Sequence, residues 1–242
     1  MFLLEVNNLT KRFGGLVAVE SLSFTVNPGE TVSIIGPNGA GKTTVFNLIT
    51  GFYQPTSGEI KFEGLDLVGR KPHKIALAGI GRTFQVVKPL RGLSVFENVL
   101  VGAFARTAVR SEAETIAREI LEFTDLAPFS DAIADGLPIG MRKRLELARS
   151  LATRPKLILL DEVMSGLNPT ESKEAIDLIK RLRDERGISA VAGVEHVMQV
   201  VMSISDRVIV LNHGKKIAEG APSQVIDNPD VIEAYLGTVS SP

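Results

Sequence analysis

The 242-residue chain contains no cysteine, which excludes disulfide bonds, cysteine-ligated zinc and a thiol nucleophile. It also lacks a surplus of positive charge, since 27 Lys and Arg residues stand against 28 Asp and Glu residues. Because no bulk positive field is available to hold a polyanion, we expect no nucleic-acid partner. No apolar run approaches the ~20 residues that cross a bilayer, and residues 1–5 lack the basic flank of a signal peptide. If the protein serves a membrane, we expect it to dock onto a partner that spans it.

Strand and helix patterns change along the chain in three stages. The first third carries β-branched and apolar runs, the middle has apolar residues at helical spacing, and strands and helices alternate after Pro155. The predicted strands are Leu3–Val6, Leu22–Val26, Thr31–Ile35, Glu59–Phe62, Lys156–Leu160, Ile188–Val194 and Arg207–Leu211, with a long helix over Glu171–Glu185. Alternation of this kind predicts an α/β fold with a mostly parallel sheet. We expect a small antiparallel β portion near the N-terminus and an inserted helical subdomain at about residues 93–152.

A glycine-rich segment follows the strand predicted at Thr31–Ile35. It matches the phosphate-loop (Walker A) pattern G-x-x-x-x-G-K-[ST], and a helix is predicted after it. Glycines let backbone N–H groups turn toward phosphates, and the positive end of the helix faces the same point. Lys42 is expected at the β- and γ-phosphates of a nucleotide and the Thr43 hydroxyl at Mg²⁺. The predicted nucleotide-binding residues are Gly36, Pro37, Asn38, Gly39, Ala40, Gly41, Lys42, Thr43 and Thr44.

Two carboxylates follow the apolar run Leu157–Leu160, which is long enough for a fully buried strand. Acids at the carboxyl end of a parallel strand lie where α/β sheets bind ligands. Asp161 is therefore the candidate Mg²⁺ ligand, directly or through water, and Glu162 the candidate general base for an attacking water. The alternative is a pair of solvated acids in a loop, and the Walker A pattern elsewhere in the chain makes the functional interpretation the stronger one.

With these two segments in place, the whole chain resembles the ABC-type ATPases. Gln85, in Thr83-Phe84-Gln85, is similar to the family's Q-loop glutamine, which would contact Mg²⁺ and the attacking water. His196 resembles the switch histidine at the γ-phosphate, and Ser165–Pro169 resembles the D-loop. Phe13 stands where the family stacks an aromatic ring on adenine. The resemblance implies one ABC ATPase domain over residues 1–242, with a RecA-like P-loop NTPase core that binds and hydrolyses ATP with Mg²⁺.

The signature loop departs from the family pattern L-S-G-G-Q. Here Pro138 replaces the serine and Met141 the glutamine, so Pro138 offers neither a hydroxyl nor a backbone N–H. The N–H of Gly140 and the helix N-terminus would remain for the phosphate of the opposite subunit. Two interpretations follow: a weakened half-site in a heterodimer, or a branch of the family adapted to proline. We favour the second, although Val163 and Val197 also replace the family's usual Pro and Asp.

Several segments resemble one branch, the ATPases of branched-chain amino acid importers. These segments are Gly81–Gln85, Leu93–Leu100, Gly166–Pro169, Ile217–Gly220 and Val231–Gly237. The resemblance implies membrane-spanning permeases and a second ATPase subunit as partners. It also implies an indirect link to a periplasmic or extracellular solute-binding protein, and a peripheral location at the cytoplasmic face of the cell membrane. A lipopolysaccharide-type exporter ATPase and a soluble ABC protein acting on nucleic acid or ribosomes are the alternatives. The single Walker A motif and the absence of cysteine disfavour the last.

Overall fold

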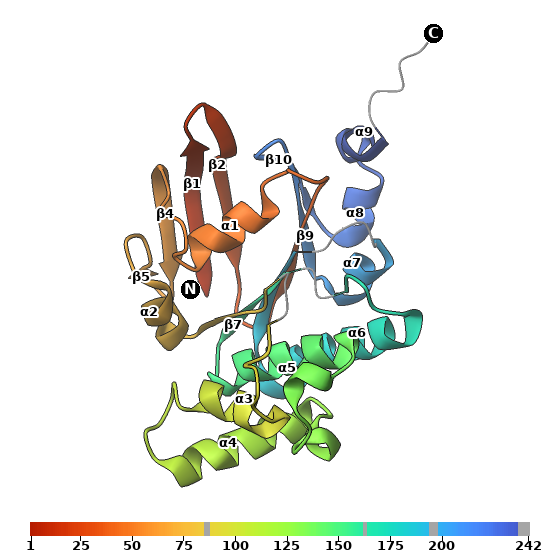
Figure 1. The fold of residues 1–242 in the computed structure, drawn as a ribbon. Coiled ribbons are helices and arrows are strands. Elements are labelled where there is room, and N and C mark those ends of the chain that lie inside the picture. The colour runs from red at the N-terminus through yellow and green to blue at the C-terminus, as the bar shows by residue number, and fades with distance from the viewer. Residues whose placement is uncertain (85–87, 162–163, 194–197, 237–242) are drawn as a thin grey trace.

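The computed structural model describes residues 1–84, 88–161, 164–193 and 198–236. Figure 1 shows the strands and helices in their order along the chain. The strands are β1 (Leu4–Phe13), β2 (Leu16–Val26), β3 (Thr31–Ile35), β4 (Ser57–Phe62), β5 (Leu65–Asp66), β6 (Ile80–Arg82), β7 (Leu157–Asp161), β8 (Ser189–Gly193), β9 (Arg207–Asn212) and β10 (Lys215–Gly220). The helices are α1 (Lys42–Ile49), α2 (Pro72–Ala78), α3 (Val95–Ala103), α4 (Arg110–Phe123), α5 (Ile139–Ala152), α6 (Pro169–Arg186), α7 (Met198–Ile204), α8 (Pro222–Ile226) and α9 (Pro229–Leu236), with 3₁₀ turns η1 (Ala127–Phe129) and η2 (Ala134–Gly136).

Two sheets form the core, and they confirm the predicted α/β fold with an antiparallel portion near the N-terminus. One sheet has the antiparallel order β2-β1-β4-β5. The other has the order β10-β9-β3-β8-β7-β6, in which β10 alone pairs antiparallel. Strand β6 was not predicted, because three residues containing a glycine carry no periodicity that could be read.

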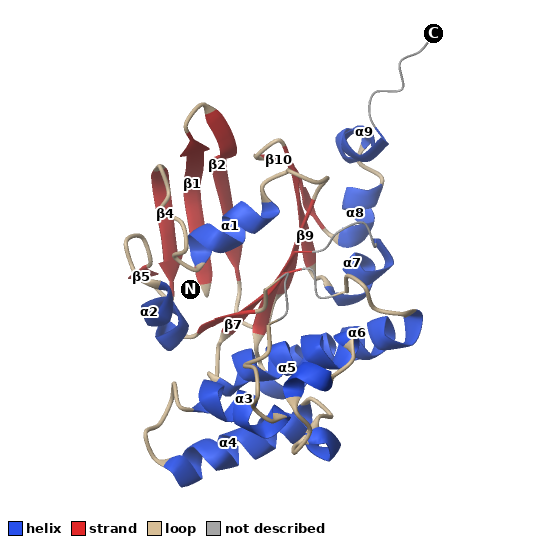
Figure 2. Cartoon of the chain, in the orientation of Figure 1, coloured by secondary structure: helices blue, strands red, loops and turns tan. Residues whose placement is uncertain are grey.

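The central sheet is covered on both faces (Figure 2). Alternate residues of β7 point to opposite sides: Leu157 and Leu159 join one apolar cluster with α1 and the antiparallel sheet, whereas Ile158 and Leu160 join another with α3 to α7. Strands β3, β7 and β8 have five residues each, and all of these residues are buried. Burial on both faces explains why these strands are almost continuously apolar rather than alternating.

Helices α3, α4 and α5 lie between β6 and β7 in the sequence and form a block at one end of the central sheet (Figure 1). Helix α3 starts with a capping box, in which the Ser94 side chain accepts from the Glu97 N–H and the Glu97 carboxylate accepts from the Ser94 N–H. The buried Asn98 donates to the carbonyls of Leu90 and Ser94, which fixes the connection that enters the block. Within the described residues, no helix is both long and apolar enough to span a membrane.

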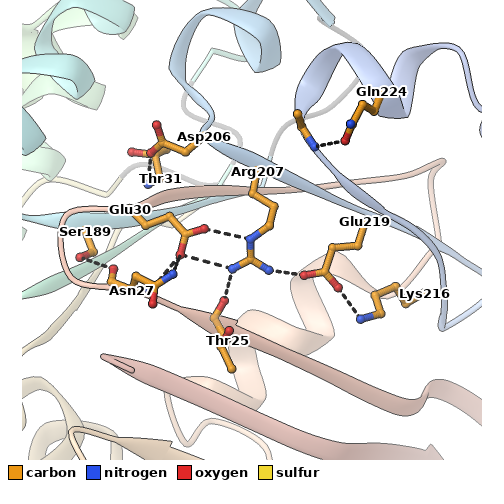
Figure 3. A network of polar contacts seen from close by, with 11 residues as sticks. Thr25, Asn27, Glu30, Thr31, Ser189, Asp206, Arg207, Lys216, Glu219 and Gln224 are labelled. Carbon is orange, nitrogen blue, oxygen red and sulfur yellow. Dashed lines mark hydrogen bonds and ion pairs between the residues drawn. The ribbon is translucent and has the colours of Figure 1, made fainter. Parts of the chain in front are cut away.

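Arg207, at the start of β9, joins both sheets through a network of polar contacts (Figure 3). Its Nε donates to Glu30 Oε1 at 2.9 Å, its Nη2 donates to the Thr25 carbonyl at the end of β2, and its Nη1 donates to Glu219 on β10. Burial by itself would raise the pKa of Glu30, but the hydrogen bonds from Arg207 and from the Asn27 backbone outweigh it and hold the pKa below its usual value. The pair therefore stabilises the junction of the two sheets while Glu30 is ionised.

We predict that Arg207→Gln lowers the free energy of unfolding by about 2–4 kcal/mol at pH 7, because it leaves a largely buried carboxylate without its cation. The native pKa of Glu30 lies below its unfolded value of 4.5, so the ion pair adds its full stability above pH 4.5. This stability is lost as the pH falls through the native pKa. The difference between variant and wild type should therefore shrink at pH 3.5. Urea unfolding at both values measures it. Arg110→Gln, in an exposed pair with Glu114, is the control and should change stability by less than about 1 kcal/mol; equal losses in both variants would contradict this account.

Candidate functional site

The phosphate loop, Gly36 to Gly41, turns sharply between β3 and α1, and two of its glycines are required by the backbone around them. Gly36 has φ 150° and a side chain there would lie 2.1 Å from the Leu211 carbonyl oxygen. Gly41 has φ 107° and a side chain would lie 2.5 Å from the Ala18 carbonyl oxygen. Both contacts are with backbone, which cannot move aside as a flexible side chain could. Glycine is therefore required at both ends of the loop, which fixes the path of the backbone into α1.

Helix α1 begins at Lys42, so Lys42 and Thr43 lie in its first turn, whereas the sequence placed the helix at Thr44–Thr50. The Lys42 ammonium lies back over the loop and donates to the carbonyls of Gly36 at 2.7 Å and Pro37 at 3.1 Å. Thr43 is exposed, as are Asn38 and Gly39, whereas Ala40 is buried and Thr44 half-buried. The N–H groups of a helix's first turn have no intrahelical acceptor, so this turn presents donors beside an exposed hydroxyl and a cation.

Asp161 lies at the same edge of the sheet as the loop. Strand register aligns Ile34 of β3 with Gly193 of β8, and Gly193 with Asp161 of β7. Two strand spacings, about 10 Å, therefore separate the strand that enters the phosphate loop from the carboxylate. A side chain at Gly193 would lie 3.3 Å from the Phe46 ring, a tight contact, and 3.6 Å from Asp161 Oδ1, so Gly193 adjoins both the ring and the carboxylate.

The Asp161 carboxylate is only 5% exposed and is held by Arg82 from β6. Arg82 Nη2 donates to Asp161 Oδ2 at 3.0 Å, and the Asp161 N–H donates to the Thr83 hydroxyl at 3.1 Å. Sequence reasoning cited Arg82 only as part of the segment Gly81–Gln85 and gave its side chain no role. Its role depends on β6 pairing with β7, which only the fold reveals.

A cleft of about 800 Å³ extends from Thr43 and Asp161 toward the helical block. Its walls include Arg82, Phe52, Phe84 and Val101, and the last three are large apolar side chains that are 43–52% exposed. The rings of Phe52 and Phe84 meet edge to face with centroids 5.8 Å apart. The cleft therefore joins the phosphate side of the sheet to an apolar surface made by both the core and the helical block.

Glu146 of α5 lines the same cleft and accepts a hydrogen bond from the Phe84 N–H at 2.9 Å. Burial raises its pKa to about 7, although the Phe84 N–H and the positive charges of Arg149, Lys143 and Arg82 act in the opposite direction. Because Phe84 directly precedes Gln85 in the chain, this contact ties the helical block to the start of the predicted Q-loop. Nothing in the sequence marked Glu146, which reads as one charged residue on an amphipathic helix.

Phe13 ends β1 and is 42% exposed, as an adenine-stacking ring requires. Tyr53, which sequence reasoning missed, packs edge to face against it with centroids 5.2 Å apart. The Lys11 ammonium lies 4.9 Å from the Phe13 centroid and 5.9 Å from that of Tyr53. The β1–β2 hairpin lies beside the phosphate loop, because the Ala18 backbone contacts Gly41. An aromatic pair is thus available next to the site for phosphates.

Gly140 lies in the first turn of α5, and Pro138 precedes this helix as its N-cap without a side-chain cap. A side chain at Gly140 would lie 2.6 Å from Glu171 Oε1 of α6. Glu171 is itself fixed, because it forms a capping box with Asn168 at the start of α6. A side chain at Gly140 would therefore displace the Glu171 carboxylate from this capping box, so the start of α5 packs closely against the start of α6.

Three predicted catalytic residues, Gln85, Glu162 and His196, lie outside the described residues. Among the residues that are described, no group of three or more His, Asp or Glu side chains could hold a metal on its own. Mg²⁺ does not need such a group, because it prefers oxygen ligands and is commonly held by one or two protein groups together with substrate phosphates. The Thr43 hydroxyl and the Asp161 carboxylate, both on the cleft, are oxygen donors of this kind.

We predict that Glu146→Gln has a higher free energy of unfolding than wild type at pH 8. This advantage should be about 1–3 kcal/mol larger at pH 8 than at pH 5. Because burial raises the native pKa of this carboxyl from 4.5 to about 7, the folded protein loses stability as the pH rises through this window, where the poorly solvated charged form would be needed. Glutamine keeps the carbonyl that accepts from Phe84 and removes the charge. Chemical unfolding at the two values measures the difference, with the exposed Glu122→Gln as control; an identical pH dependence for Glu146→Gln and wild type would refute the assignment.

Known relatives match nearly the whole chain. A high-affinity branched-chain amino acid transport ATP-binding protein, BraF of Pseudomonas aeruginosa, is 46% identical, covering 97% of this chain and 98% of the relative. The corresponding Escherichia coli protein, LivG, is 44% identical with the same coverage. A probable branched-chain amino acid transport ATP-binding protein of Archaeoglobus fulgidus is 36% identical, covering 100% of this chain and 98% of the relative.

Solved structures and family models agree with this similarity. The ADP conformation of an ATP-binding cassette of an ABC transporter superposes with a TM-score of 0.87 at 33% identity, covering 98% of this chain and 99% of that one. A dimeric cassette in a post-hydrolysis state with ADP and Pi gives 0.80 at 28% identity, covering 90% and 98%. Residues 19–165 match the ABC transporter model, and residues 215–240 match that of the branched-chain amino acid ATP-binding cassette transporter. The chain therefore belongs to the ABC transporter family of ATP-hydrolysing cassettes, in its branched-chain amino acid group.

Proposed function

We propose that this protein is the ATPase subunit that drives import of branched-chain or other hydrophobic amino acids, or of related small solutes, through a membrane transporter. The observation that carries the proposal is the near-complete match to BraF and LivG, whose names describe high-affinity transport of these amino acids. The match extends to residues 215–240, which lie outside the general ATP-binding region. Lipopolysaccharide export, the alternative drawn from sequence, is not what these names describe.

The phosphate loop and the first turn of α1 would bind the nucleotide phosphates. Lys42 would leave the Gly36 and Pro37 carbonyls for the β- and γ-phosphates, a short movement of a flexible side chain. Phe13, with Tyr53 beside it, would stack on adenine. Bound Mg²⁺ would neutralise charge on the phosphates, and Thr43, Gln85 and Asp161 are the groups proposed to hold it. Asn38, Gly39, Ala40, Gly41 and Thr44 complete the proposed phosphate contacts.

Glu162 is proposed to take a proton from the attacking water, with Gln85 and His196 orienting that water at the γ-phosphorus. The site is proposed to be completed by a second cassette, whose signature loop would cover the phosphates with its Gly140 N–H and the N-terminus of α5. The dimeric form of a solved cassette bound to ADP and Pi supports such a pairing. Pro138 would leave this interaction to backbone groups, as expected for a branch adapted to proline.

The cleft beside Arg82 and Glu146 is proposed to receive a helix of a membrane-spanning permease subunit. It offers exposed Phe52, Phe84 and Val101 on walls that belong to the core and to the helical block. A helix wedged there would move with the block, which couples closure of the two cassettes to the permease. The proposed location is the cytoplasmic face of the cell membrane, with a periplasmic or extracellular solute-binding protein delivering the solute to the other side.

The ATPase assignment is tested by Glu162→Gln. We expect MgATP binding close to that of wild type, steady-state hydrolysis reduced at least about 100-fold, and a nucleotide-dependent dimer on size-exclusion chromatography. Glutamine preserves the shape of the side chain but cannot accept the proton. The exposed Glu185→Gln on α6 is the matched control and should behave as wild type. Retained turnover would remove Glu162 from its proposed role, and failure of the wild type to bind nucleotide would overturn the proposed function.

A further inference from the structure

Arg82 joins three elements through one guanidinium. Its Nη1 donates to Asn47 Oδ1 at 2.7 Å and to Thr50 Oγ1 at 3.0 Å, both from the C-terminal end of α1. Its Nη2 donates to Asp161 Oδ2 at 3.0 Å. The Arg82 side chain is 7% exposed and that of Asp161 5%, so the pair is almost completely removed from water. The helix that follows the phosphate loop and the carboxylate proposed for Mg²⁺ are thus held at a fixed distance by one planar group.

The same guanidinium touches the aromatic wall of the cleft. Its carbon lies 4.9 Å from the Phe84 centroid and 5.8 Å from those of Phe46 and Phe52. Phe52 and Phe84 are half-exposed on the cleft, whereas Phe46 is buried in the core. A displacement of the two exposed rings would therefore act directly on the group that holds Asp161.

Stability alone does not account for this arrangement. A buried ion pair contributes little net stability, since removing two charges from water costs about as much as their attraction returns. In addition, Arg82 Nε is buried and has no hydrogen-bond partner within the described residues, a state that costs about 1–3 kcal/mol. A buried polar atom without a partner requires an explanation, and retention for function is one that the surrounding contacts supply.

We propose that Arg82 is a positioning residue: it fixes the Asp161 carboxylate for the divalent cation and links that carboxylate to the aromatic wall of the cleft. The inference rests on the proposed function and adds to it the residue through which the cleft and the cation site are coupled. A planar guanidinium suits the role, because it can bond two directions at once while its face lies against aromatic rings. Residues that orient a metal ligand typically change metal affinity 10–100-fold when altered.

The test measures the affinity of Mn²⁺, as a spectroscopic substitute for Mg²⁺, on the full chain saturated with a non-hydrolysable ATP analogue. Electron paramagnetic resonance reports free and bound Mn²⁺ without any turnover. We expect Arg82→Lys, which keeps the charge but not the fork, to weaken Mn²⁺ binding about 10–100-fold. Nucleotide affinity measured in the presence of a chelator should stay near that of wild type. If Arg82 were purely structural, Arg82→Lys would lower stability without weakening Mn²⁺ binding more than nucleotide binding.

Two further variants, together with a control, keep the inference falsifiable if Arg82→Lys does not fold. Asn47→Leu removes one anchor of the guanidinium while Asp161 stays paired, and Phe52→Ala removes a ring that contacts it from the cleft. Each should weaken Mn²⁺ binding about two- to tenfold. Arg106→Gln is the control: among the described residues, Arg106 donates only to backbone carbonyls, including that of Leu77, so Mn²⁺ affinity should stay unchanged.

Unshifted Mn²⁺ affinity in folded Arg82→Lys, or in both Asn47→Leu and Phe52→Ala, would overturn the inference while the proposed function stands. If wild type binds the analogue but not Mn²⁺, or binds neither, the proposed function itself fails and the inference with it. The two failures are distinguishable because the first appears only in the variants and the second already appears in wild type.

Discussion

The register of three parallel strands determines where the functional groups of this protein can meet. Ile34, Gly193 and Asp161 lie in one row at the carboxyl edge of β3, β8 and β7. The phosphate loop leaves the sheet directly after that row, and a side chain at Gly193 would press on the Phe46 ring. A shift of one residue in either pairing would turn the Asp161 side chain to the opposite face of the sheet. The buried apolar faces of these strands therefore specify the site as well as the fold.

Beyond this row, polar contacts between distant segments connect the site to the rest of the molecule. Arg82 ties β6 to β7 and α1, and Glu146 ties α5 to the backbone of Phe84. Glu171, fixed by its capping box, packs against Gly140 where α5 begins. All three contacts join the core to the helical block or to the edge of the sheet nearest it. Relative movement of the block would therefore change the surroundings of the Mg²⁺ and nucleotide groups proposed above.

Sequence reasoning predicted the parts of the site whose chemistry is carried by local spacing. The eight residues from Gly36 to Thr43 contain the whole phosphate-loop pattern, and the apolar run before Asp161 marks a buried strand. The structure has the predicted strand before the loop and the buried strand β7, and the phosphate-binding role of the loop stays a prediction. The alternating pattern after Pro155 likewise predicted the parallel sheet. Roles for Gln85, Glu162 and His196 remain predictions from the family resemblance, since these residues lie outside the described part of the chain.

Residues whose roles depend on long-range contacts could not be predicted. Arg82 contacts Asp161, 79 positions away, through a three-residue strand without periodicity. Tyr53 reaches Phe13 only because the β1–β2 hairpin lies beside the chain that leaves α1. Gly140 was assigned to phosphate binding, and no local pattern encodes its close approach to the Glu171 side chain of α6. In each case the missing information was tertiary pairing rather than residue chemistry.

The central claim, an ATPase that drives amino acid import, is tested most directly by purifying the tagged chain from detergent-solubilised native membranes and identifying its partners by mass spectrometry. The account predicts multi-span permease subunits, a second ATPase subunit and a solute-binding protein that binds branched-chain amino acids. Recovery with ribosomal or DNA-associated proteins and no membrane partner would contradict it.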